Sequence, residues 1–339
     1  EIKTNTKVES LEKLLEQGYD ATMLAVGAHQ GMKLPLPGSD LEGVLINTSL
    51  LRDARLGNEV NIGERVVVLG GGNVAYDCAR TSLRLGAKEV RLACLEPDGG
   101  MLASPDEIEE GDAEGIMVHC SHTYIRIVDD GNGHVAGVEC HDVSSFNFDA
   151  TGRLQVNVVA GSEHILPADT VVFAVGQIPE LELIKEVSEI QTVRGRFVAI
   201  NADTLATGKE GIFAAGDAVT GTTSVIQAIA AGRQAAISMD KYLGGNGEIE
   251  ETLVDPEIGS LFLGQREGFG DKQRVAVPSL PVEERKNNFN VVELGYGQTE
   301  GFEEADRCLQ CHLRCEISPP PLPPEKKPES KQETFTLVS

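Results

Sequence analysis

The chain has 339 residues, too many for one ordinary hydrophobic core, so at least two domains are expected. Hydrophobic residues make up 41% of it and charged residues 24%, the composition of a soluble globular protein. Because 29 Lys and Arg stand against 53 Asp and Glu, the net charge is −24, and phosphate backbones and anionic lipid surfaces would repel the chain. We therefore expect neither nucleic-acid binding nor membrane association.

The start of the chain and its cysteines bear on where the protein works. No apolar run approaches the roughly 20 residues that a membrane helix needs. The first residues have no signal-peptide form and no initiator Met, so we expect the chain to begin inside a longer protein. Four of the seven cysteines are scattered and three cluster near the end, unlike a secreted disulfide framework. A cytoplasmic protein is predicted.

The first elements in chain order change in character near residue 64. The stretch VESLEKLLEQ predicts an amphipathic helix, followed by a turn at Gly18, a buried strand over residues 21–26 and the Pro/Gly-punctuated loop LPLPGSDLEGV. A strand over 66–69, a helix over 74–85 and a strand over 90–95 come next. This alternation predicts an α/β fold with a parallel sheet covered by helices.

The later elements are shorter. Residues 117–172 contain β-type runs broken by DDGNGHV and DATGR, which predicts an antiparallel meander. Two further buried strands end in Gly176 and Gly216, and the second leads through a polar turn into a long Ala-rich helix. After Gly245 the composition becomes loop-like, and residues 319–339, rich in Pro, Lys and Glu, are predicted to be disordered.

The stretch RVVVLGGGNVAYDCAR has the spacing Gly70-x-Gly72-x-x-Ala75 directly between a strand and a helix, which is the context that a dinucleotide fingerprint requires. Gly70 would allow the tight turn, Gly72 the approach of a pyrophosphate, and Ala75 close helix–strand packing. Phosphates would bind the free N–H groups at the start of the helix, and Asn73 belongs to the same candidate site. The alternative is a glycine-rich turn without a ligand.

An acidic residue stands where a ribose would lie. Glu96 follows the second strand, about 20 residues beyond the glycines, where a carboxylate can accept a hydrogen bond from a ribose 2′-OH and would repel the 2′-phosphate of NADP. No Arg lies just beyond it. The pattern favours NAD(H) over NADP(H), and a solvated surface glutamate is the alternative.

The segment GIFAAGDAV ends a buried strand in Gly216-Asp217. Here the chain resembles the FAD-dependent pyridine nucleotide oxidoreductases, and within them the glutamate synthase small-subunit type. YDATMLAVGAH, LPLPGSDLEGV, VVVLGGGNVAYDCART and GIFAAGDAVTGTTSVIQAIAAGRQAA carry the likeness over residues 1–245. The resemblance implies two Rossmann-like domains, the NAD domain inserted in the FAD domain, and AVGA and AVGQIP look like the crossovers between them.

The resemblance also implies roles for individual residues and a division of the chain. Asp217 would hold the ribityl hydroxyls of FAD, unless it merely caps the next helix. Other implied cofactor-binding residues are Gly176, Gly216, Thr223, Ser224 and Val225. The implied segments are 1–62 (end of the first FAD segment and linker), 63–172 (NAD(H)-binding domain), 173–245 (second FAD segment) and 246–318 (tail with a cysteine cluster).

Two departures from the resembled family shape the expectation. Its members open with a cysteine-rich Fe–S segment and a first FAD-binding βαβ unit, and neither precedes residue 1. The FAD domain is therefore expected to be incomplete at its N-terminus, the rest coming from a longer form of the chain or from another oxidoreductase subunit. Glutamate synthase small subunits usually carry an Arg pair in the stretch that here reads LACLEPDGGMLASPDE, so an NADH-preferring branch is expected.

The tail EEADRCLQCHLRCEI spaces three thiols as Cys308-x2-Cys311-x3-Cys315, with His312 between them. This spacing suits part of a 4Fe–4S cluster, which needs a fourth ligand, or zinc bound by three cysteines and one histidine. Free thiols on a helix are the alternative without metal. Cys78 and Cys94 are expected only to pack, and the absence of a C-x-x-C from residues 65–172 gives dithiol chemistry no support.

The sequence thus predicts a flavin-dependent oxidoreductase subunit that passes electrons between NAD(H), FAD and the iron–sulfur clusters of a partner. No catalytic side chain is predicted, because the chemistry would belong to the cofactors. One alternative is a glutamate synthase small subunit that uses NADPH. The other is a non-catalytic nucleotide-binding or assembly module.

Overall fold

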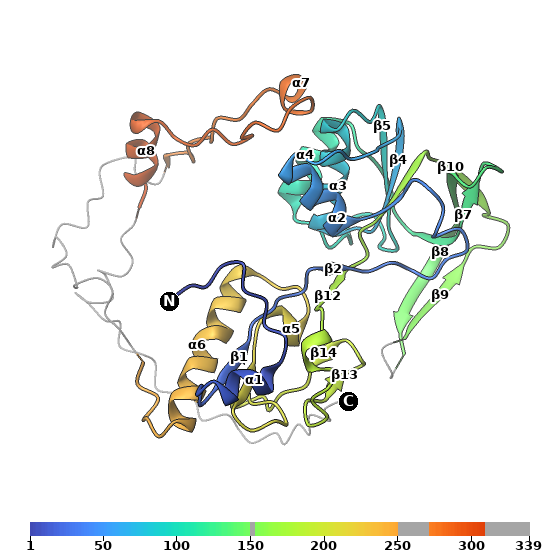
Figure 1. The fold of residues 1–339 in the computed structure, drawn as a ribbon. Helices are drawn as coiled ribbons and strands as arrows, with labels where there is room; N and C mark the ends of the chain where they lie inside the picture. The colour runs from blue at the N-terminus through green and yellow to red at the C-terminus, as the bar shows by residue number, and fades with distance from the viewer. Residues whose placement is uncertain (150–152, 250–270, 309–339) are drawn as a thin grey trace, which may run out of the picture. The chain divides into compact units, whose positions relative to one another are not determined.

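The computed structural model describes residues 1–149, 153–249 and 271–308 (Figure 1). The expectations for Cys311, Cys315 and the end of the chain fall outside these ranges. The chain divides into one unit of residues 1–146 and 156–251 and a second of residues 147–155 and 252–339. Within the described ranges, no helix combines the length and apolar character that crossing a bilayer requires.

A parallel pair of short strands forms the centre of the segment built from both ends of the first unit. β1 (Thr22–Leu24) pairs in parallel with β15 (Ile212–Ala214). Around this pair lie α1 (Leu11–Glu16), η1 (Glu182–Ile184), β13 (Thr192–Val193), β14 (Phe197–Val198), α5 (Asp217–Thr220) and α6 (Val225–Tyr242). The core of this segment consists of Leu11, Leu24, Ile184, Val187, Ile190, Val198, Ile212 and Ala214.

The middle of the first unit contains a five-stranded parallel sheet of order β3-β11-β4-β5-β6. Its strands are β3 (Val44–Ile46), β11 (Thr170–Phe173), β4 (Arg65–Leu69), β5 (Glu89–Ala93) and β6 (Met117–His119). Three helices accompany it: α2 (Asn47–Leu56), α3 (Asn73–Arg84) and α4 (Pro105–Glu114). The sheet therefore includes residues before 63, which the sequence assigned to the preceding segment.

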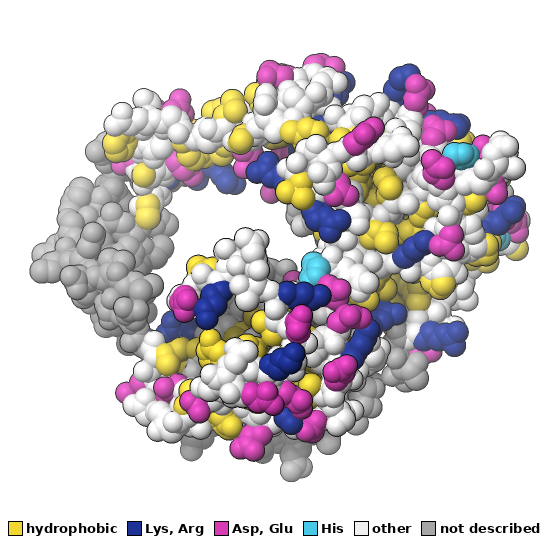
Figure 2. Space-filling view, viewed as in Figure 1, with side chains coloured by type: hydrophobic (Ala, Val, Ile, Leu, Met, Phe, Trp, Pro, Cys, Tyr) yellow, Lys and Arg dark blue, Asp and Glu magenta, His cyan; other side chains and the backbone are white. Residues whose placement is uncertain are grey.

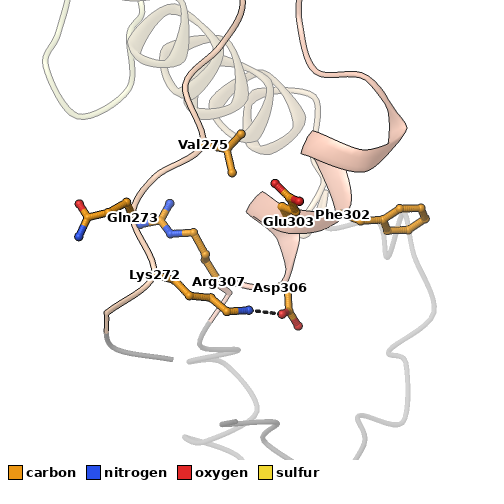
Figure 3. A pocket seen from close by; sticks show the side chains of 7 residues that line it. All are labelled: Lys272, Gln273, Val275, Phe302, Glu303, Asp306 and Arg307. Atoms are coloured by element: carbon orange, nitrogen blue, oxygen red, sulfur yellow. Dashed lines mark hydrogen bonds and ion pairs between the residues drawn. The ribbon is translucent and has the colours of Figure 1, made fainter. Parts of the chain in front are cut away.

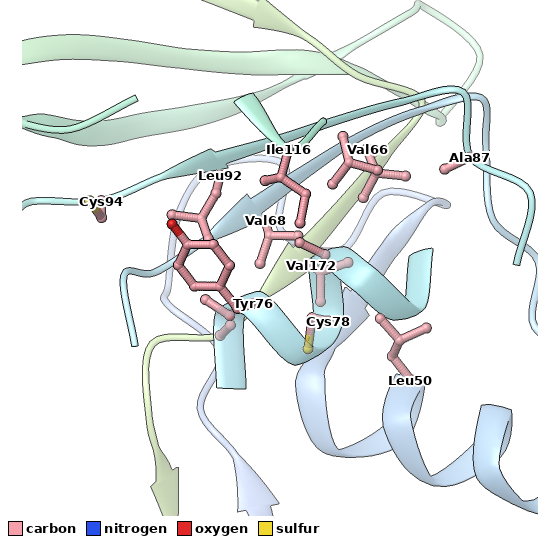
Figure 4. Packing of buried hydrophobic residues seen from close by; sticks show 14 of the residues in the cluster. Leu50, Val66, Val68, Tyr76, Cys78, Ala87, Leu92, Cys94, Ile116 and Val172 are labelled. Atoms are coloured by element: carbon pink, nitrogen blue, oxygen red, sulfur yellow. The ribbon is translucent and has the colours of Figure 1, made fainter. Parts of the chain in front are cut away.

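Alternation along β4 gives this sheet two different faces. Val66 and Val68 pack with Tyr76 and Cys78 of α3 in one core, shown in Figure 4. Val67 and Leu69 belong to a second core with residues of an antiparallel sheet. These four residues of β4 are fully buried, and burying one such side chain contributes about 1.5–3 kcal/mol, so an apolar run was required here. Helices thus cover one face of the parallel sheet, and a second sheet covers the other.

The antiparallel sheet contains β7 (His122–Asp129), β8 (Val135–Phe148), β9 (Leu154–Val158) and β10 (His164–Pro167), with β8 paired to the other three. The predicted meander is confirmed for these strands. It is wrong for β6, which pairs in parallel with β5. Only three residues long and exposed at Met117, β6 carries too little apolar pattern to reveal its partner.

The two predicted crossovers lie side by side. β2 (Gln30–Gly31) pairs antiparallel with β12 (Gln177–Ile178), and the Met32 N–H donates to the Gly176 carbonyl oxygen at 3.0 Å. The buried strand expected to run to Gly176 ends earlier, at Phe173. The two connections therefore form one two-stranded ribbon.

The second unit contains α7 (Val282–Arg285) and α8 (Gln298–Ala305) among its described residues. An isolated antiparallel bridge joins Ser279 to Glu293.

On the face shown in Figure 2, Lys and Arg side chains are scattered among Asp and Glu. The described residues on that face form no continuous basic patch.

Gly111 on α4 has no room for a side chain, because a Cβ there would lie 2.4 Å from Cε1 of the fully buried Tyr76. Ala is favoured over Gly in helices by about 1 kcal/mol, but overpacking a core costs about 1–3 kcal/mol, so the clash should win. We expect Gly111→Ala to lower the free energy of unfolding by about 1–2 kcal/mol in urea titrations. Gly232→Ala on α6, where a Cβ meets nothing within 4 Å, should raise it; equal effects of the two substitutions would contradict the packing.

Candidate functional site

The glycine loop follows β4 and opens α3, as predicted. Gly70 has φ +137°, and a Cβ there would lie 2.3 Å from the Ala174 carbonyl oxygen. Its N–H donates to the Ala93 oxygen at 2.8 Å, which ties the turn to the end of β5. Only glycine suits this position, because both the backbone conformation and the close approach of β11 exclude a side chain.

Gly72 has a different role from Gly70. A Cβ at Gly72 would meet nothing within 4 Å, and its φ of −97° is open to any residue. Gly72 is the N-cap of α3, and no side chain caps the helix there. The start of α3 thus combines free space with the positive end of a helix dipole, the arrangement that binds phosphates. Ala75 is fully buried, in agreement with its predicted packing role.

The middle glycine is a site residue that sequence reasoning missed. A Cβ at Gly71 would lie 2.8 Å from Cys94 Cβ and 2.9 Å from Glu96 Oε2. The fingerprint treats this position as variable, and only the run of three glycines signalled a further constraint. Gly71 lets the loop pack directly against the residues that follow β5.

Asn73 holds a neighbouring loop. Its Oδ1 accepts a hydrogen bond from the Ser104 N–H at 2.7 Å, and the Gly71 oxygen accepts one from the Ala103 N–H at 3.0 Å. The structure thus engages the Asn73 side chain in fixing the segment that precedes α4. Its predicted contact with a cofactor remains a prediction.

Glu96 lies beside the glycine loop. β5 ends at Ala93, two residues before the predicted end, so Glu96 stands in the loop that follows the strand. Its carboxylate approaches Gly71, and its backbone oxygen accepts a hydrogen bond from the Ser121 N–H at 2.8 Å. A carboxylate next to the glycines and beyond the second strand is suitably placed for a ribose hydroxyl.

A buried ion-pair cluster fixes α3 against α4. Glu114, whose side chain is fully buried, lies 3.0 Å from Arg80 and 2.8 Å from Arg84. Arg80 also pairs with Glu107 and Glu110. Burial alone would raise the pKa of Glu114, but the hydrogen bonds from the two guanidinium groups outweigh it and lower that pKa. The helix that carries the glycine loop is therefore clamped at its other end.

Gly216 and Asp217 form the second candidate site, shortly after β15, which ends at Ala214, two residues before its predicted end. Gly216 has φ +70° and ψ −154°, a region essentially restricted to glycine. Asp217 Oδ1 accepts hydrogen bonds from the Thr223 N–H at 3.2 Å and the Thr223 hydroxyl at 3.3 Å. The alternative role of Asp217 as the cap of the long helix is wrong, because Ser224 caps α6 in a capping box with Gln227.

The start of α6 is apolar and exposed. Val225, Ile226 and Ile229 are 78%, 70% and 61% exposed. The Ser224 hydroxyl is engaged in the capping box, so the N-terminus of the helix is capped by a side chain. Exposed apolar side chains on one helix face usually mark a surface that contacts another molecule or segment.

The described cysteines divide by burial. Cys78 and Cys94 are fully buried in the core beside α3, and burial raises the pKa of both thiols, in agreement with a packing role. Cys308 is exposed, and the other two thiols of its motif lie outside the described residues. The predicted Fe–S or zinc site in the tail therefore stays a prediction.

A pocket of the second unit lies between residues 272–275 and α8. Figure 3 shows its lining: Lys272, Gln273, Val275, Phe302, Glu303, Asp306 and Arg307. Three of the charged lining residues are engaged in ion pairs, Lys272 with Asp306 and Arg307 with Glu304. The pocket shares no residue with the glycine loop or with the Gly216–Asp217 turn.

Comparisons with known proteins identify the family and agree with the observed fold. The family described as pyridine nucleotide-disulphide oxidoreductase matches residues 1–235. The chain belongs to this family, and the expected oxidoreductase class and α/β fold with Rossmann-like domains are confirmed. Thioredoxin reductase of T. acidophilum has a similar fold, with a TM-score of 0.50 and 22% identity over 66% of this chain and 65% of that one.

Curated relatives lie within the same family. The chain is 33% identical to the beta subunit of NADP(+)-dependent formate dehydrogenase of Moorella thermoacetica, over 92% of this chain and 45% of that protein. It is 33% identical to the beta subunit of NADPH-Fe(3+) oxidoreductase of Geobacter sulfurreducens, over 89% and 50%. The small chain of glutamate synthase [NADPH] of Escherichia coli is 38% identical over 72% and 55%. The chain spans about half the length of the curated relatives it matches.

Proposed function

We propose that the chain is the pyridine nucleotide- and flavin-binding part of an oxidoreductase subunit, which passes electrons between NAD(H), FAD and iron–sulfur clusters of a partner. The observation that carries this proposal is the glycine loop, where Gly72 leaves open space at the uncapped start of α3 and the Glu96 carboxylate lies alongside. This arrangement suits a dinucleotide, because phosphates fit the helix start and a ribose fits the carboxylate.

The residues of the second turn are proposed to hold FAD. Gly216 gives the backbone its sharp turn, Asp217 offers a carboxylate to ribityl hydroxyls, and Thr223 fixes that carboxylate through two hydrogen bonds. When bound, FAD supplies the conversion between two-electron exchange with a nucleotide and one-electron exchange with iron–sulfur clusters. The chain itself would bind and orient these groups.

The FAD site is proposed to need a further polypeptide segment. β1 and β15 form a two-stranded parallel sheet among the described residues, whereas parallel sheets normally have more strands and are covered on both faces. The exposed apolar start of α6 lies in the same segment. We propose that another part of the same protein, or a partner subunit, adds strands to this pair and covers α6.

The free thiols of the described cysteines support placement in a reducing cytoplasm.

Full-length protein purified without oxygen provides the test. The proposal predicts a flavin spectrum that NADH bleaches, and protein that shows neither would refute it. The Escherichia coli relative makes a glutamate synthase small chain a second candidate. Glutamine-dependent NADPH oxidation with a large-subunit partner would identify that alternative, and nucleotide binding without bleaching would identify a non-catalytic module.

Glu96 is proposed to set the nucleotide preference toward NADH, although the relatives above are named for NADP(+) or NADPH. A hydrogen bond to a charged group contributes about 1.5–3 kcal/mol, so Glu96→Ala should weaken NADH binding roughly 10–100-fold. NADPH binding should strengthen or stay constant, because repulsion of the 2′-phosphate is removed. Asp98→Ala, an exposed acid in the same loop, is the control. Unchanged affinities of Glu96→Ala for both nucleotides would remove Glu96 from the ribose site.

A further inference from the structure

Three side chains, none of them part of either glycine turn, meet on one face of the antiparallel sheet. His122 opens β7 and stands opposite Asp142 of β8, while His164 opens β10 and stands opposite Cys140, two residues before Asp142. One potential ligand atom from each of His122, Asp142 and His164 lies within 4.8 Å of the other two. Three strands held in register thus bring together groups that are far apart in the sequence.

Hydrogen bonds fix the tautomers of both imidazoles. Nδ1 of His122 lies 2.6 Å from the Cys120 backbone oxygen, and Nδ1 of His164 lies 2.7 Å from the Ser162 backbone oxygen. A carbonyl oxygen only accepts, so each Nδ1 must carry the proton and donate it. In the neutral rings, both Nε2 atoms are then unprotonated and present lone pairs.

The two Nε2 atoms face each other at 3.1 Å, and Asp142 Oδ1 lies 3.7 Å from Nε2 of His122. Two lone pairs and a carboxylate at these distances repel one another unless a positive charge lies between them. Both rings donate their second nitrogen to a backbone carbonyl, which is the arrangement that orients metal-binding histidines in proteins. The ligand atoms are therefore arranged for a cation.

We propose that His122, His164 and Asp142 bind a divalent transition-metal ion of the Zn²⁺ class. Imidazole nitrogens with one carboxylate suit Zn²⁺ and its neighbours, whereas Mg²⁺ and Ca²⁺ prefer oxygen ligands alone. Zn–N bonds of about 2.0–2.1 Å in a tetrahedron place ligand atoms about 3.3–3.4 Å apart, between the two distances observed here. His122 is 14% exposed and Asp142 51%, so the carboxylate is free to adjust and solvent can supply a fourth ligand.

The proposed ion has a structural consequence close to the glycine loop. It would join β7, β8 and β10 at one end of the sheet. His122 follows Ser121, whose N–H holds the Glu96 backbone oxygen, and the His122 N–H donates to the Cys94 oxygen at 2.7 Å. The metal site would therefore fix the same turn that supports Glu96.

Zinc titration of the full-length protein, freed of metal and competed with a chromogenic chelator, tests the proposal. The substitution His164→Asn keeps an amide near the position of Nδ1 but removes Nε2. The variant protein should therefore bind one equivalent of Zn²⁺ fewer than the wild type, or should bind that equivalent at least about 100-fold more weakly. Asp142→Asn, at a half-exposed position where misfolding is a small risk, should weaken the same equivalent roughly 10–100-fold. His134→Asn, directly before β8 and 52% exposed, should bind as the wild type does.

X-ray absorption at the zinc edge separates this site from the cysteine tail. The equivalent lost in His164→Asn should show nitrogen and oxygen ligands near 2.0–2.1 Å, without the sulfur ligands near 2.3 Å of a thiolate site. Zinc binding that His164→Asn and Asp142→Asn both leave unchanged would overturn the proposal. So would wild-type protein without a stoichiometric equivalent, since a proton shared between the two rings would then explain their contact.

Discussion

Replacing Gly72 with aspartate should abolish pyridine nucleotide binding while leaving the protein as stable as before. The structure offers room for the new side chain, since a Cβ at Gly72 meets nothing within 4 Å. Asp is a better N-cap than Gly and suits the positive end of α3, so stability should stay constant or rise by a few tenths of a kcal/mol. The carboxylate would nevertheless occupy the place of the pyrophosphate. At about 4 Å a like charge costs about 4 kcal/mol near a protein surface, roughly a 1,000-fold loss of affinity.

Gly72→Asn is the matched control, because it has the same size and capping ability without the charge. Its nucleotide affinity should fall less than that of Gly72→Asp, and fluorescence titration with NADH measures both. Thermal unfolding of the two variants should coincide with that of the wild type. Nucleotide affinity that both substitutions leave intact would mean that the pyrophosphate does not lie at Gly72.

Replacing Glu114 with glutamine should lower the free energy of unfolding by about 3–5 kcal/mol. Breaking a buried ion pair leaves the remaining charge without compensation, and here two guanidinium groups lose their shared, fully buried carboxylate. Arg80 retains Glu107 and Glu110, so Arg84 carries most of the cost. Glu109→Gln, an exposed acid on the same helix, should change stability by less than about 0.5 kcal/mol in urea titrations.

The same carboxylate should make stability depend on pH. Its pKa in the folded protein is lowered below the ordinary value of 4.5, so its contribution is complete above that value and is lost as the pH falls through the folded pKa. The wild type should therefore lose more stability than Glu114→Gln on acidification below about pH 4.5. Parallel pH profiles of the two proteins would contradict a charged Glu114 in the clamp.

Local signals predicted the elements of the proposed nucleotide site. A strand, three glycines and a helix follow one another within RVVVLGGGNVAYDCAR, so one short segment contains the whole pattern. The observed helix α3 begins one residue before the predicted helix. The strand that includes Met117–His119 was misassigned because its pairing with β5 depends on distant residues. Asn73 was predicted as a cofactor contact, but its hydrogen bond to Ser104 depends on a loop whose path the sequence does not reveal.

The histidine cluster lay beyond sequence reasoning for a different reason. His122, Asp142 and His164 share no spacing pattern, and only the register of three antiparallel strands brings them together. A shift of one residue in either pairing would move a ligand to the opposite face. Register depends on turns and bulges, such as the irregularity between Tyr124 and Arg126, which the composition of a strand does not reveal.

The strand order of the parallel sheet has a consequence for folding during synthesis. β11 lies between β3 and β4, although it is the last of the five strands to leave the ribosome. Until Thr170–Phe173 emerges, β3 has no partner and β4 can pair only with β5. Non-local strand pairing of this kind is slow, and the edges of β3 and β4 remain exposed until β11 pairs with them. We expect the nascent chain to depend on chaperones up to this point, and the glycine loop to become rigid only when Ala174 closes over Gly70.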